Sequence, residues 1–222
     1  MTVCGFTRLD LRWQRHLPFV RRRATALPAQ DAFSLVELLI VFALMLVLYT
    51  LCFSFASAVH QKTQKELCAD NLQKIYIALQ IYGDDFGQFP VNTNAQTSEA
   101  VLNALVPRYT ADTAIFICPG GRDSAIPSGA PLTNRVISYA YYMGRGTNQS
   151  SDIPLMSDRQ INELSKDKGD QVFSLTGKPP GNNHHKYGGN FLFSDGSVQT
   201  IGPHAPFSLA FTNGIVLLNP KP

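Results

Sequence analysis

The most prominent hydrophobic pattern in the sequence is an apolar run near the N-terminus. From Phe33 to Val59 the only charged residue is Glu37. A helix needs about 20 apolar residues to cross the hydrocarbon core of a bilayer. The sequence therefore predicts a transmembrane helix over residues 33–59.

The helical pattern continues beyond this run. No Pro or Gly occurs between Phe33 and Gly83, and apolar residues then recur with the alternating spacing of four and three that marks one helix face. These residues are Cys68, Leu72, Ile75, Leu79 and Tyr82. We expect one continuous helix over residues 33–82, ended by Gly83 and Gly87, with its first half in lipid and its second half packed on a domain.

The rest of the chain has a β pattern with long connections. A short helix is predicted from Ser98, as its N-cap, to Pro107. Strands are predicted at 114–117, 136–142, 190–194, 197–201 and 215–218, and a long loop region at 143–182. Asp195-Gly196 is typical of a two-residue hairpin turn. The expected fold class is α+β, with the long N-terminal helix packed on a small antiparallel sheet.

Charge separates the N-terminal segment from the rest. The formal net charge is +3, and residues 1–32 hold six Arg against two acidic residues. The remainder is close to neutral, which argues against a nucleic-acid-binding body, because phosphate contacts need Lys and Arg spread over the folded surface. Arg21, Arg22 and Arg23 precede the apolar run and predict that the N-terminus stays in the cytoplasm. Everything after residue 60 would then be exported.

Three interpretations compete for the apolar segment. A secretory signal peptide would have a shorter apolar core, although Ala56-Ser57-Ala58 fits a signal-peptidase site. A plain signal anchor explains the run but not Glu37, because a carboxylate inside an apolar span is costly and usually functional. The third interpretation accounts for Glu37. The stretch Ala32-Phe33-Ser34-Leu35-Val36-Glu37 resembles the prepilin cleavage site of type IV pilins and type II secretion pseudopilins.

That resemblance implies a pilin-like fold and a division into a basic leader (1–32), a transmembrane half-helix (33–59) and a periplasmic α+β domain (60–222). It implies cleavage between Ala32 and Phe33 by a prepilin peptidase, followed by N-methylation of Phe33. Glu37 would then pair with the Phe33 amine of a neighbouring subunit, or it is a Glu that snorkels to the membrane surface. The implied partners are other pilin or pseudopilin subunits, an inner-membrane assembly platform and the lipid bilayer.

A second resemblance lies near the C-terminus. His185, nine intervening residues and Asp195-Gly196 resemble the His-x9-Asp-Gly signature of a large pilin-like family. Cys68-x2-Asn71-Leu72, Cys118-Pro119 and Ser138-Tyr139 also resemble stretches of those proteins. The family's roles are mostly unassigned, so the resemblance implies architecture rather than activity.

An enzyme ranks third among the expected functions. The sequence lacks the common zinc motifs, the G-x-S-x-G elbow, a Gly-rich phosphate loop and an EF-hand-like calcium loop. His184 and His185 are adjacent in a polar stretch, where a structural hydrogen bond to a turn is the simpler role. We therefore expect no catalytic residues, no metal and no cofactor. An enzyme would require His185 and Asp195 to converge in a deep pocket with a third polar group.

The cysteines suggest a cross-link. Cys4 lies in the leader and Cys52 in the apolar run, so only Cys68 and Cys118 would reach the oxidising side of the membrane. We predict a Cys68–Cys118 disulfide, with two buried thiols as the alternative. The expected function is a structural fibre subunit, with a membrane-anchored periplasmic binding module that does not polymerise as the alternative.

Overall fold

The computed structural model describes residues 34–148, 150–211 and 214–222. The chain divides into two compact units after Val47, and each is described by itself. The predicted leader 1–32 and the predicted cleavage site, Ala32 and Phe33, lie outside the described residues.

Helix α1 (Leu35–Phe86) confirms the predicted continuous helix but ends later than expected. It passes through Gly83 and ends before Gly87, whose φ of 71° is the left-handed conformation common after helix C-termini. Gly83 has a packing role instead, because a Cβ there would lie 2.8 Å from Cγ2 of Thr147.

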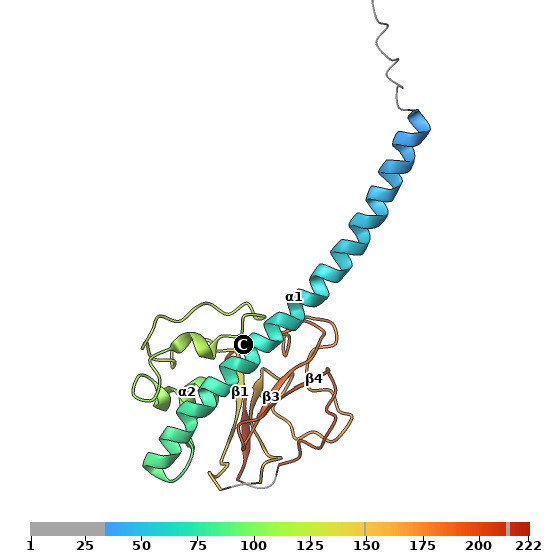
Figure 1. Cartoon of the computed structure of the whole chain (residues 1–222). Coiled ribbons are helices and arrows are strands. Elements are labelled where there is room, and N and C mark those ends of the chain that lie inside the picture. The colour runs from blue at the N-terminus through green and yellow to red at the C-terminus, as the bar shows by residue number, and fades with distance from the viewer. Residues whose placement is uncertain (1–33, 149, 212–213) are drawn as a thin grey trace, which may run out of the picture. The chain divides into compact units, whose positions relative to one another are not determined.

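The second unit contains a five-stranded sheet in which every neighbouring pair is antiparallel. The strands are β1 (Tyr139–Met143), β2 (Pro154–Asp158), β3 (Gly189–Phe193), β4 (Val198–Ile201) and β5 (Val216–Leu218). Their order in the sheet is β4-β3-β2-β1-β5. Strands β1, β3 and β4 are labelled in Figure 1. The predicted hairpin about Asp195-Gly196 is present as β3–β4, so the α+β class is confirmed.

Two sequence-based predictions were wrong. Residues 114–117 were expected to form a strand, but Thr113–Phe116 form the 3₁₀ helix η2, where Asp112 accepts a hydrogen bond from the Ala114 amide. The region 143–182 was expected to be loop, but it supplies β2, a central strand. The short helix also shifts: α2 (Ser98–Leu102) has Thr97 rather than Ser98 at its N-cap position, without a side-chain capping hydrogen bond, and continues as η1 (Asn103–Leu105).

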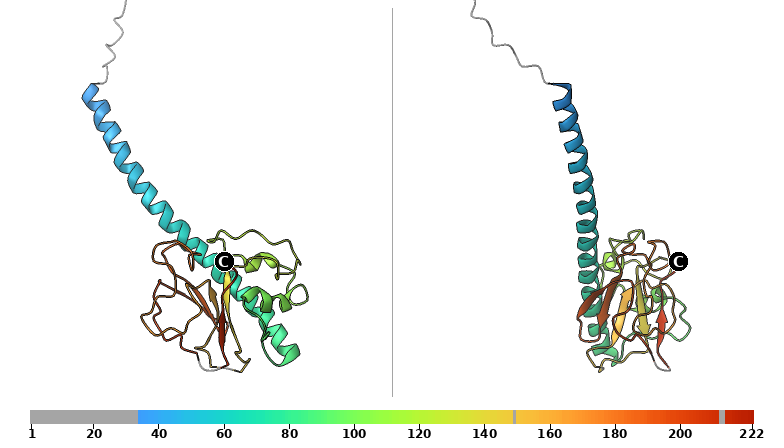
Figure 2. Two further views of the ribbon diagram at one scale, coloured as in Figure 1. Left: turned by 180° about the vertical axis from the view of Figure 1, so that it is seen from behind. Right: turned by 90° about the vertical axis from the view of Figure 1, so that its right-hand side faces the viewer.

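Both faces of the sheet are buried at strands β1, β2 and β3. Cys68, Leu72 and the other stripe residues of α1 pack on the face formed by Tyr139, Tyr141 and Met143 of β1. On the opposite face, alternate residues such as Tyr142 pack with side chains from residues 172–173 and 205–211. The views in Figure 2 show the C-terminal part of α1 along one side of the sheet. Burial of both faces explains why β1, β2 and β3 lack an alternation of buried and exposed residues.

Candidate functional site

The first candidate site is the apolar segment of α1. Among the described residues, Leu35–Cys52 is the one stretch of helix long and apolar enough to cross a membrane, with a mean hydropathy of 2.6. None of this stretch is buried against the rest of the chain. A single N-terminal helix of this kind is consistent with a single-pass membrane protein.

Glu37 is the acidic residue in the first turn of this helix. A carboxylate there interacts favourably with the helix dipole, which is positive at its N-terminal end. Its side chain is exposed, and no ion pair joins it to another of the described residues. The described structure therefore places a lone carboxylate among exposed apolar side chains.

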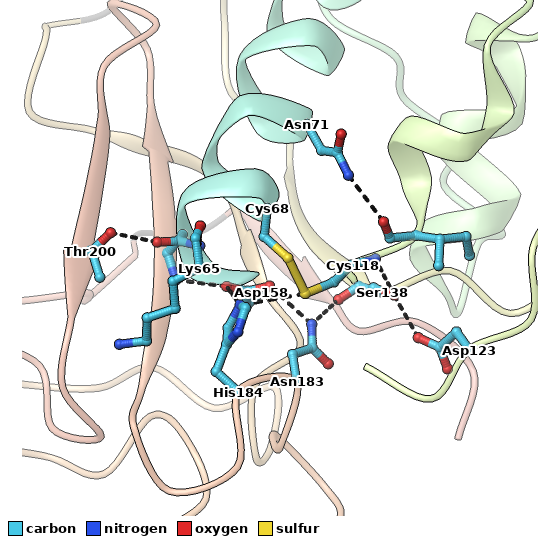
Figure 3. The surroundings of a disulfide bond; sticks show 12 residues. Lys65, Cys68, Asn71, Cys118, Asp123, Ser138, Asp158, Asn183, His184 and Thr200 are labelled. Atoms are coloured by element: carbon cyan, nitrogen blue, oxygen red, sulfur yellow. Dashed lines mark hydrogen bonds and ion pairs between the residues drawn. A yellow bond between two sulfur atoms is a disulfide. The ribbon is translucent and has the colours of Figure 1, made fainter. Parts of the chain in front are cut away.

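The second candidate site surrounds a disulfide between Cys68 of α1 and Cys118, which follows η2 (Figure 3). The two Cα atoms are 5.2 Å apart, and both residues are buried. This is the pairing predicted from the sequence. The Cys118 amide donates a hydrogen bond of 2.9 Å to the Ser138 hydroxyl, which donates one of 2.6 Å to Asp123. The cross-link therefore joins the helix to a loop that is itself held at the start of β1.

His184 and Asp158 lie against the disulfide with no exposed surface. His184 Nε2 is 3.4 Å from Cys118 Sγ and 3.3 Å from Asp158 Oδ2. One ligand atom from each of Cys68, Cys118, Asp158 and His184 lies within 4.8 Å of all the others. We call these four residues the buried cluster.

Hydrogen bonds fix the Asp158 carboxylate. The Asn183 side-chain amide donates to Oδ1 at 3.0 Å, and the Asn190 backbone amide donates to Oδ2 at 2.7 Å. Asn183 also donates to the Ser138 carbonyl at 2.7 Å. Asp158 is thus rigidly oriented at the end of β2, although Asp is uncommon in central strands.

The position of His184 depends on a close approach of two loops. A Cβ on Gly120 would lie 2.6 Å from His184 Nδ1 and 2.6 Å from the Asn183 carbonyl oxygen. Nδ1 is buried and has no hydrogen-bond partner among the described residues. A glycine is therefore required at residue 120 for the imidazole to reach the disulfide.

Burial is the largest cause of the pKa shifts of two groups beside the cluster, Lys65 and Tyr139. Burial lowers the pKa of Lys65, and the nearby Asp158 carboxylate opposes this shift. Burial also raises the pKa of the Tyr139 phenol well above its usual range, and the charge of Asp158 adds to the effect. Lys65 is therefore a cation of α1 that interacts with the Asp158 charge, while Tyr139 stays a neutral phenol.

The signature residues His185, Asp195 and Gly196 have other environments. His185 is exposed and has a φ of 54°, so its side chain diverges from that of His184. Asp195 accepts a hydrogen bond from the Ser197 amide at 2.8 Å, and hydrogen bonds from Ser197 lower the pKa of Asp195. These contacts are local to the turns that contain the two residues. His185 and Asp195 thus show turn-forming roles rather than a shared site.

Sequence reasoning found both cysteines of the buried cluster, missed Asp158, and considered His184 only together with His185, with a structural role for both. Asp158 lay in a presumed loop, and the adjacent histidines could not be ranked without the turn geometry. Comparisons with protein-family models, curated proteins and solved structures found no match to this chain. The similarity to pilins therefore rests on the sequence motifs described above.

Proposed function

We propose that this chain is a pilin-like structural subunit that is processed by a prepilin peptidase and assembled into a type II secretion pseudopilus or a type IV pilus-like fibre. The observation that carries the proposal is Glu37, a carboxylate in an exposed apolar helix four residues after the expected new N-terminus at Phe33.

The physical argument concerns how that charge is compensated. An isolated carboxylate in hydrocarbon is unfavourable, whereas a carboxylate paired with an ammonium group is much less so. Cleavage before Phe33 would create such an ammonium group in each subunit. Pairing between subunits would favour the fibre over the isolated membrane protein, and it would also set the axial register.

Further support comes from the second unit. The part of α1 in this unit is fixed to the segment after η2 by the disulfide and by a hydrogen bond of 3.0 Å from Asn71 to the Ile117 carbonyl. Its outward side still carries exposed Leu67, Ile77 and Ile81. A helix with one face docked on its own domain and apolar residues on the other is suited to packing with neighbouring helices.

Processing provides the first test. Protein purified from membranes should have an intact mass and N-terminal sequence that begin at N-methyl-Phe33, since the leader is removed and the new amine methylated. A chain that begins at Val59 would instead establish signal-peptide cleavage and contradict the proposal.

Assembly provides the second test. The Glu37→Val variant should insert into membranes at least as well as the wild type, because a carboxylate is removed from the apolar segment. Its fibre yield, measured by shearing and immunoblotting, should fall to background. The Glu66→Val variant is the matched control, because it removes an exposed carboxylate of α1 outside the apolar segment. Normal fibre yield from Glu37→Val would favour the alternative, a membrane-anchored binding module.

A further inference from the structure

We propose that the buried cluster is a redox-gated binding site for a divalent zinc ion. When Cys68 and Cys118 are reduced, their thiolates would ligate Zn²⁺ together with His184 Nε2 and Asp158 Oδ2. Two sulfurs, one imidazole nitrogen and one carboxylate oxygen form a ligand set that suits tetrahedral zinc. The inference does not depend on fibre assembly.

Two of the distances within the cluster fit such a site, whereas ligand atoms that now lie up to 4.8 Å apart would have to move closer together. Tetrahedral zinc has bonds of about 2.3 Å to sulfur and about 2.0–2.1 Å to nitrogen or oxygen, so its sulfur–nitrogen and nitrogen–oxygen edges are about 3.6 and 3.4 Å. The corresponding distances are 3.4 Å from Cys118 Sγ to His184 Nε2 and 3.3 Å from His184 Nε2 to Asp158 Oδ2. On reduction the two sulfurs would also separate to about 3.8 Å.

The surroundings already hold the ligands as a metal site requires. Asp158 Oδ1 is occupied by Asn183, and the Asn190 amide orients Oδ2 toward the imidazole. Such supporting hydrogen bonds fix ligand orientation in metalloproteins. All four side chains are buried, so bulk water does not compete for the ligands. The ligands come from α1, the loop after η2, the end of β2 and the loop before β3, so a bound ion would join four segments.

The redox chemistry makes the zinc-bound state and the disulfide-bonded state mutually exclusive. Binding of Zn²⁺ to the reduced pair releases one proton from each thiol. A disulfide-containing oxidant would then accept two electrons from the two thiolates, forming the Cys68–Cys118 bond while its own sulfurs leave as thiolates and take up two protons from water. The zinc ion is released because a disulfide offers no thiolate. Metal content would therefore report the redox state of the subunit.

The test uses the full chain in detergent, with Cys4→Ala and Cys52→Ala to remove the other thiols. The protein is reduced with a phosphine, and Co²⁺ is the spectroscopic probe. We expect one equivalent of cobalt to produce the visible absorption of a tetrahedral ion and a thiolate-to-cobalt charge-transfer band, both abolished by one equivalent of zinc. The oxidised protein should give neither band. A folded, reduced protein without these bands would overturn the proposal.

Adjacent histidines provide a matched pair of variants. His184→Gln should weaken cobalt binding by about tenfold or more, because a ligand is lost, whereas His185→Gln should bind as the wild type does. Equal effects of the two substitutions would contradict the assignment. If reduction alone unfolds the domain, added zinc should restore its native circular dichroism, because binding then drives folding. Failure of zinc to restore the fold would also overturn the proposal.

Discussion

Gly196, in the β3–β4 turn, combines a left-handed φ of 83° with close contact to α1. A Cβ there would lie 2.5 Å from Cε1 of Tyr76, whose hydroxyl donates a hydrogen bond of 2.9 Å to the Ser194 carbonyl. Gly196→Ala should lower the free energy of unfolding by about 2–3 kcal/mol, from the left-handed conformation and the loss of this hydrogen bond. Urea unfolding followed by circular dichroism measures the change.

The Gly169→Ala variant separates the cost of the left-handed conformation from the cost of losing the Tyr76 hydrogen bond. Gly169 has a φ of 98°, but no atom lies within 4 Å of its ideal Cβ position. Its substitution should therefore cost only the conformational part, about 1–2 kcal/mol. Equal losses in the two variants would show that the turn does not depend on its contact with Tyr76.

Lys166 is a buried cation held by three oxygen acceptors. Its Nζ donates to Gln160 Oε1, the Asn162 carbonyl and the Leu164 carbonyl at 2.9–3.1 Å. Burial lowers the pKa of Lys166 from 10.5 to about 8, against opposing contributions from Asp170 and Glu163. Between these two values the unfolded chain binds more protons at this residue than the folded chain does. The contribution of Lys166 to stability should therefore increase with pH across this window.

The comparison with Lys166→Met tests this pH dependence. From pH 7.5 to 9.5, the free energy of unfolding of the wild type should rise relative to that of Lys166→Met, because the variant lacks the titrating group. Lys168→Met is the control, since Lys168 is exposed and should leave the pH profile unchanged. A constant difference between wild type and Lys166→Met would show that the amine titrates normally in the folded protein.

The adjacent histidines show the limit of sequence reasoning at single residues. His184 and His185 share the same polar stretch, and only the resemblance to the His-x9-Asp-Gly signature singled out His185. Their different burial follows from the left-handed backbone at His185 and from the space left by Gly120. Both are consequences of loop geometry, which residue types alone do not determine.

Among the elements, the Cys68–Cys118 cross-link gives the clearest stability prediction. It encloses a sequence separation of 50 residues, for which the chain-entropy model gives about 4 kcal/mol of stabilisation. Cys68→Ala combined with Cys118→Ala should lower the unfolding midpoint markedly, while Cys52→Ala, at the exposed free cysteine, should not.

Thiol counting tests the same bond chemically. In denatured mature protein, alkylation before reduction should label one thiol, that of Cys52. Labelling of three thiols would contradict the bond.

How well each helix or strand could be predicted depended on the length of its hydrophobic pattern in the sequence. Helix α1 was predicted well, because the apolar run and the buried stripe extend over many turns. Residues 114–117 were misassigned, since a short apolar run is equally compatible with a strand and a helical turn. Strand β2 was missed because it starts at Pro154 and ends with Ser157 and Asp158. Tertiary hydrogen bonds to Asp158 stabilise this strand, and no local propensity reveals them.

At the scale of the whole molecule, the proposed topology predicts export of the second unit. Alkaline phosphatase fused through a flexible linker after Pro222 should be active, because the Arg-rich segment before the apolar run is expected to keep the N-terminus in the cytoplasm. β-Galactosidase at the same junction serves as the control, since it is active only in the cytoplasm. Activity of β-galactosidase without phosphatase activity would show that the second unit lies in the cytoplasm and would contradict the predicted orientation.

The contacts of α1 with its domain also bear on folding speed. Lys65 donates a hydrogen bond to the Ile201 carbonyl, 136 residues later in the sequence. Tyr76 donates one to the Ser194 carbonyl, 118 residues later. Contacts this distant require large loops to close, which slows folding. A chain already joined at Cys68 and Cys118 bypasses the 50 residues between them, so its helix searches for the strands through a shorter loop. Oxidised protein should therefore refold faster than reduced protein in stopped-flow experiments, so the order of oxidation and docking would set how soon the second unit is folded.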